Sequence, residues 1–159
     1  MRISDKFTCD YLQINSSELM NRAAEACVNE ILTRFDNSKS ILVVCGPGDN
    51  GGDGFAIAIK LKNLGFNVEV IDVDSQSKSE NNIYYKSIFI SNNGKCDLYK
   101  PGKPIAQKDI LIDAVFGSGL SRQIEGVFAE LINAINACNS YVIAIDSPSG
   151  FCTENEMPE

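Results

Sequence analysis

The fold is decided by the stretch Ile41-Leu-Val-Val-Cys-Gly-Pro-Gly-Asp-Asn-Gly-Gly-Asp-Gly54 and the apolar positions that recur at helical spacing from Phe55 to Leu64. Residues 41–45 form an unbroken apolar run rich in β-branched side chains, which is typical of a buried strand. The five glycines of residues 46–54 predict a turn with several positive φ angles, and Gly65 is predicted to end the helix. A strand, a glycine turn and a helix together present backbone N–H groups and a helix N-terminus to an anion.

Two interpretations of this turn are open at this point. Gly46-x-Gly48-x-x-Gly51 satisfies the G-x-G-x-x-G fingerprint of dinucleotide-binding folds, and Asp72 at the end of the next strand is placed to bind a ribose. The same residues also suit a tight connection that binds nothing. Neither interpretation explains the continuation Asn50-Gly-Gly-Asp-Gly54.

The rest of the chain alternates between helical and strand patterns. Asn15 is a candidate N-cap for a helix over residues 16–34, with Glu18 three residues further on. Alternating strands and helices predict an α/β fold, a Rossmann-like three-layer α/β/α arrangement with a mostly parallel central sheet and an N-terminal helix. The 159 residues suit a single domain over 1–159. The other predicted elements are strands at 67–73, 96–99, 109–116 and 141–146 (the last one buried) and helices ending at 90 and spanning 124–137.

The composition excludes several classes of function. The net charge of −7 argues against nucleic acid or an anionic membrane surface as partner, and no apolar run reaches the length of a membrane span. The six cysteines contain no C-x-x-C pair, so we expect reduced thiols in a cytoplasmic protein, and the N-terminus lacks a signal-peptide core. The absence of histidine leaves acid–base chemistry to Asp, Glu, Lys, Tyr or Cys.

Polar residues follow three predicted strands. Asn50 lies in the glycine turn, Asp113 lies near the end of the strand at 109–116, and Asp146 ends the strand at 141–146. Because parallel strands end at one edge of a sheet, these residues predict a polar pocket there. A second Gly-Ser-Gly turn begins at Gly117, and it is followed by Arg122, which either contacts a phosphate or ribose or is simply solvated.

Four strings in this order resemble the N-terminal domain of the YjeF family, the NAD(P)HX epimerases. They are Leu-Met-x-Arg-Ala-Ala at 19–24, Gly-Pro-Gly-Asp-Asn-Gly-Gly-Asp-Gly at 46–54, Ile-Asp-Ala-Val-Phe-Gly-Ser-Gly-Leu-Ser-Arg at 112–122 and Ala-Ile-Asp-Ser-Pro-Ser-Gly at 144–150. The resemblance implies an isomerase that interconverts the R and S forms of hydrated NAD(P)H. It also implies a homodimer and a NAD(P)HX dehydratase as functional partner.

The same resemblance implies roles for individual residues. One K⁺ per subunit is ligated by Asn50, Asp113 and Ser149, whose oxygen atoms are hard ligands of the kind alkali cations accept. Asp146 contacts the substrate, and we expect it to be the catalytic acid and base. The substrate-binding residues implied are Asp49, Asn50, Gly51, Gly52, Asp53, Gly117, Ser118, Gly119, Leu120, Ser121, Arg122, Gln123 and Asp146.

Some positions depart from the family pattern. Asp49 stands where the family usually has Asn, Ala24 where it has Gly, and Ser147 where it has an aliphatic residue. The family also continues with further strands, so we expect the last strand here to be an exposed edge. Two alternative functions are a catalytically silent, dimerising scaffold of the kind found in some RNA-decapping proteins, and a NAD-dependent oxidoreductase. For the oxidoreductase, the sequence shows no group that would assist hydride transfer.

Overall fold

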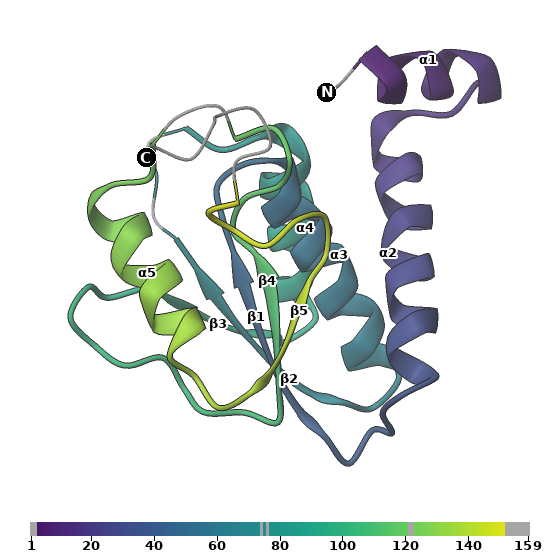
Figure 1. Ribbon diagram of the computed structural model, residues 1–159. Helices are drawn as coiled ribbons and strands as arrows, with labels where there is room; N and C mark the ends of the chain where they lie inside the picture. The colour runs from purple at the N-terminus through teal and green to yellow at the C-terminus, as the bar shows by residue number, and fades with distance from the viewer. Residues whose placement is uncertain (1–2, 74, 76, 121–122, 152–159) are drawn as a thin grey trace.

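The computed structural model describes residues 3–73, 75, 77–120 and 123–151. Its five strands form one parallel sheet in the order β3-β2-β1-β4-β5, which is the order of a doubly wound fold (Figure 1). The fold class predicted from the sequence is therefore confirmed, and the pairing is parallel throughout. The strands are β1 (Ser40–Cys45), β2 (Asn67–Asp72), β3 (Lys95–Leu98), β4 (Ile110–Ala114) and β5 (Tyr141–Ala144).

Helices cover both faces of the sheet, as Figure 1 shows. One apolar cluster joins one face of the sheet to α2 (Ser16–Leu32), α3 (Asp49–Asn63) and α4 (Glu80–Ser91). A second cluster joins the other face to α5 (Gly126–Asn136). The additional helix α1 (Ile3–Leu12) was not predicted, and it lies beyond the start of α2, away from the sheet.

The helix after β1 begins earlier than predicted. It starts at Asp49, so Gly51, Gly52 and Gly54 lie inside its first turns, and none of residues 46–54 has a positive φ angle. The prediction of an extended glycine turn was therefore wrong. Close packing explains these glycines, because a Cβ at Gly54 would lie 2.6 Å from Ala114 Cβ. The predicted end of α3 is confirmed, since Gly65 has a φ of +88°.

Helix α2 begins as predicted. The side-chain oxygen of Asn15 accepts a hydrogen bond from the Glu18 N–H at 2.7 Å, which satisfies one of the free amides of the first turn. Of its apolar residues, Met20, Ala24 and Ile31 are buried, whereas Ala23 and Leu32 are exposed.

Strand β5 is an edge of the sheet and pairs only with β4 among the described strands. Tyr141 and Val142 are 51% and 43% exposed, so the prediction of a buried strand was wrong and that of an exposed edge is confirmed. An apolar run occurs in central and edge strands alike. It therefore does not show whether a further element covers the strand and buries it.

The cysteines Cys27, Cys45, Cys96 and Cys138 are free thiols, as predicted, whereas the side chains of Cys9 and Cys152 lie outside the part of the chain that the structure describes. Complete burial raises the pKa of Cys45 well above its usual value, which keeps this thiol protonated and unreactive. In the part of the chain that the structure describes, no helix is both long and apolar enough to cross a membrane.

Candidate active site

The carboxylate of Asp146 lies just beyond β5, at the carboxyl edge of the sheet. It is exposed, and it accepts hydrogen bonds from the Ser118 N–H at 2.7 Å and from the Ser118 hydroxyl at 2.8 Å. Ser118 belongs to the loop that follows β4. Two segments that are distant in the sequence therefore fix the orientation of one accessible carboxylate.

Gly117 brings a third segment to the same place. A Cβ at Gly117 would overlap the Asp146 carboxylate and would lie 3.4 Å from Asn50 Oδ1. Asn50 is the second residue of α3, and its Nδ2 is buried with no hydrogen-bond partner among the described residues. The predicted gathering of Asn50 and Asp146 at one edge is thus present, with an amide nitrogen left unpaired beside it.

Asp113 and Ser149 form a second polar group at this edge. Asp113 is 3% exposed and accepts hydrogen bonds from the Ser149 N–H at 2.8 Å and the Ser149 hydroxyl at 2.6 Å. Ser149 Oγ accepts in turn from the Phe116 N–H at 2.9 Å. No lysine or arginine among the described residues forms an ion pair with Asp113, so hydrogen bonds alone compensate this buried carboxylate.

Asp49, the residue that departs from the family pattern, is the first residue of α3 and is exposed. Its carboxylate accepts a hydrogen bond from Asn81 Nδ2 at 3.2 Å, and the same amide donates to Ser16 Oγ at 2.9 Å. A negative charge in the first turn is favoured by the helix dipole. The extra charge therefore helps to join α3, α4 and α2.

The other predicted binding residues are divided between buried and exposed positions. Gly51 and Gly52 are buried, and Asp53 is half-buried. Gly119 and Gln123 are exposed and Leu120 is half-buried; Ser121 and Arg122 lie outside the described residues. Their contact with a substrate stays a prediction.

Asn82 is a polar residue of this region that was not predicted. It is completely buried in α4, and its Nδ2 donates to Gly46 O at 2.7 Å. Nothing in the polar run of residues 74–82 distinguishes this asparagine from its neighbours, so no sequence signal would have identified it.

Asp72 does not have the surroundings of a ribose-binding acid. It is 0% exposed and forms ion pairs with Lys78 at 2.5 Å and Lys86 at 2.6 Å. Both carboxylate oxygens therefore have cationic partners inside the protein, which removes the support that this residue gave to the simple G-x-G-x-x-G interpretation.

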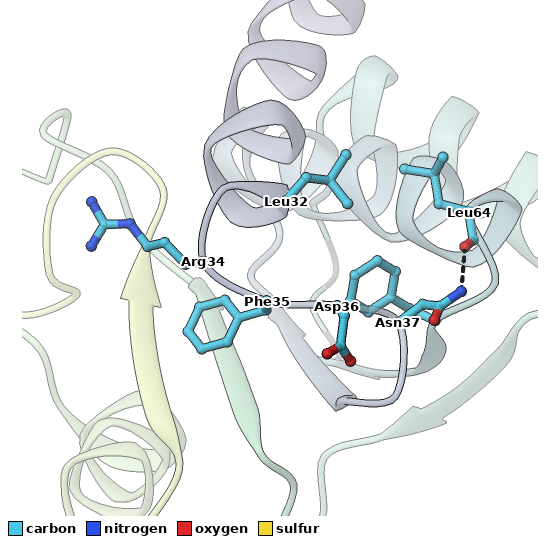
Figure 2. A pocket seen from close by; sticks show the side chains of 7 residues that line it. Leu32, Arg34, Phe35, Asp36, Asn37 and Leu64 are labelled. Atoms are coloured by element: carbon cyan, nitrogen blue, oxygen red, sulfur yellow. Dashed lines mark hydrogen bonds between the residues drawn. The ribbon is translucent and has the colours of Figure 1, made fainter.

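A cavity of about 510 Å³ lies at the opposite, amino-terminal end of β1 and β2. Figure 2 shows the side chains that line it, together with the hydrogen bond from Asn37 Nδ2 to Leu64 O at 3.4 Å. Its Arg34 pairs with Glu30 at 2.7 Å, and hydrogen bonds from Ser38 lower the pKa of its Asp36. None of the predicted site residues lines this cavity.

The fold and the site define a doubly wound α/β protein whose polar groups gather at the carboxyl edge of the sheet, beside the β1–β4 switch point where such sheets bind ligands. The family described as YjeF-related protein N-terminus matches residues 16–159, and the chain belongs to this family.

Named relatives agree with this assignment. The chain is 37% identical to a NAD(P)H-hydrate epimerase of Limosilactobacillus fermentum, covering 97% of this chain and 74% of the relative. It is 31% identical to a bifunctional NAD(P)H-hydrate repair enzyme, Nnr, of Thermofilum pendens, covering 94% of this chain and 30% of the relative. The fold is also that of the crystal structure of yeast YNL200c, with a TM-score of 0.69 and 23% identity over 84% of this chain and 61% of that one.

Proposed function

We propose that this chain is an epimerase that interconverts the R and S forms of NAD(P)HX. The observation that carries the proposal is the exposed Asp146 carboxylate, which Ser118 holds beside Asn50. It occurs in a chain 37% identical to a named epimerase. An oriented carboxylate next to a fixed dinucleotide is what this reaction needs.

The proposed chemistry exchanges one water molecule. Protonated Asp146 gives its proton to the hydroxyl on C6 of the hydrated ring, the C6–O bond breaks, and the ring nitrogen lone pair forms an iminium. Water then adds to the other face of C6, and the Asp146 carboxylate takes back a proton. No electrons are transferred to an acceptor, so the dinucleotide is the substrate of the reaction.

The residues expected to hold K⁺ fit a monovalent cation. Asn50 Oδ1, the Asp113 carboxylate and Ser149 Oγ are hard oxygen ligands, and the Asp113 charge lacks an ion-pair partner in the described chain. A bound cation would compensate that charge and reduce the repulsion between the site and an anionic dinucleotide. We also propose that the protein is a cytoplasmic homodimer whose product is used by a NAD(P)HX dehydratase.

A stereochemical assay tests the function. Purified R-NADHX is incubated with the protein, and the appearance of S-NADHX is followed by chromatography against the spontaneous rate. We expect a clear acceleration in K⁺ and a slower reaction when choline replaces K⁺ at equal ionic strength. Protein that is folded by circular dichroism but gives no acceleration would favour the silent scaffold.

The cation site makes a separate prediction. Ser149→Ala removes a hydroxyl that contacts Asp113, so it should raise the K⁺ concentration needed for half-maximal rate by about tenfold, the effect of about one hydrogen bond. Ser147→Ala is the matched control, because it removes a nearby hydroxyl that the proposal does not use. Equal K⁺ requirements in the two variants would exclude Ser149 as a ligand.

A further inference from the structure

The loop between β1 and α3 turns three consecutive carbonyl groups towards the start of α4. Gly46 O accepts a hydrogen bond from Asn82 Nδ2 at 2.7 Å, and Pro47 O accepts one from the Ser79 N–H at 3.0 Å. Gly48 O is 3.5 Å from Asn82 Nδ2 and also accepts from the Gly52 N–H at 3.2 Å. One completely buried amide group therefore serves two of the three carbonyls.

This arrangement determines where the amides of the loop point. The described peptide bonds are all trans, and in a trans peptide the C=O and the N–H lie on opposite sides. With Pro47 O and Gly48 O held against α4, the Gly48 and Asp49 N–H groups point away from it. The first N–H groups of a helix have no partner within the helix, and they carry the positive end of its dipole. The start of α3 thus offers donors, and not acceptors, to an anion.

The packing around Asn82 leaves little freedom for this loop. A Cβ at Gly51 would lie 2.6 Å from Asn82 Nδ2, and one at Gly52 would lie 3.1 Å from Asn82 N. Asn82 Oδ1 is buried with no hydrogen-bond partner among the described residues, which carries a free-energy cost. An apolar residue would avoid that cost, but it would leave Gly46 O without its donor.

From these contacts we propose that Asn82 is a positioning residue that sets the affinity of the glycine loop for the phosphates of the dinucleotide. The proposal rests on the epimerase function proposed above. Phosphates do not react, so the loop binds them equally in the ground state and the transition state. Loss of such binding raises KM and leaves kcat nearly unchanged.

The test compares Asn82→Ala and the milder Asn82→Ser with Ser79→Ala. Ser79 caps α4 through its side chain, which accepts from the Asn82 N–H at 3.2 Å, while its backbone N–H is the group that bonds to Pro47. Ser79→Ala therefore weakens α4 without removing a donor to the loop. Both Asn82 variants should raise KM for NADHX and Kd for NADP⁺, measured by calorimetry, by about tenfold, with kcat within about twofold. Ser79→Ala should change neither constant.

Hydrogen exchange gives a readout that needs no activity. Peptides covering residues 48–55 should exchange about tenfold faster in the Asn82 variants, while those of β4 and α5 keep their wild-type rates. A lower kcat at unchanged KM and Kd would show that Asn82 acts only on stability and would overturn the proposal. If the wild type binds NADP⁺ but does not epimerise, the epimerase assignment fails while Kd and exchange still decide the role of Asn82. A wild type that does not bind NADP⁺ would overturn both.

Discussion

Asp146→Asn is expected to lower kcat/KM for epimerisation by about 10²- to 10⁴-fold, the usual contribution of a positioned general acid and base. Asparagine is close to aspartate in size and keeps an oxygen that can accept from Ser118, so the loop after β4 should stay in place. It cannot give or take a proton at neutral pH. Because Asp146 is exposed, the free energy of unfolding should change by no more than about 0.5 kcal/mol.

Asp109→Asn is a matched control for this experiment. Asp109 accepts hydrogen bonds from the Ser40 N–H at 2.8 Å and the Ser40 hydroxyl at 2.7 Å, the same two kinds of bond that Asp146 accepts from Ser118. Asp109 precedes β4, at the opposite end of the sheet from Asp146. The control should keep its activity. Activity in Asp146→Asn within tenfold of the wild type would remove Asp146 from the chemistry and require another proton donor at the site.

The sheet and its polar edge could be predicted from the sequence because their signals are local. The apolar run of β1 is followed directly by Gly46, and that of β4 is followed, after Val115 and Phe116, by the Gly-Ser-Gly turn at 117–119. Parallel strands bring those ends together. The pairing of Asp113 with Ser149 and the approach of Gly117 to Asn50 are consequences of that topology. The parallel arrangement was enough to predict that Asn50, Asp113 and Asp146 would gather at one edge, whereas the presence of Ser149 there was implied only by the family resemblance.

Other features depend on contacts that no local pattern records. The partners of Asp72 come from Lys78 in a loop and Lys86 in a helix, so its burial as part of an ion cluster was not predictable. The helix α1 was not predicted although Ile3, Phe7 and Tyr11 recur at four-residue spacing. In the structure Phe7 and Tyr11 are 69% and 77% exposed, so these two side chains cover no part of the core. The early start of α3 depends on how closely it packs against neighbouring segments, which outweighs the poor helix propensity of glycine.

The packing around the glycine loop makes the strongest stability prediction. In Gly46→Ala the new Cβ would overlap Val115 O and lie 2.7 Å from Val115 C and 2.9 Å from Val115 Cα. These are backbone atoms, and the Gly46 N–H is itself held by Ala114 O at 3.0 Å, so neither segment can move aside without losing hydrogen bonds. We expect a loss of about 3 kcal/mol or more in the free energy of unfolding, measured by denaturant titration.

Gly48→Ala tests whether this loss comes from the overlap of the new Cβ with Val115, and not simply from replacing a glycine of the loop by alanine. A Cβ at Gly48 meets no atom within 4 Å, and its φ of −85° is accessible to alanine. Alanine is a poorer N-cap than glycine, but it also reduces the entropy of the unfolded chain, and these effects of similar size oppose each other. The unfolding free energy should therefore stay within about 0.5 kcal/mol of the wild type. Equal losses of unfolding free energy in Gly46→Ala and Gly48→Ala would contradict the close approach of Gly46 to Val115. They would also contradict the position of the glycine loop, which places Asn50 at the site.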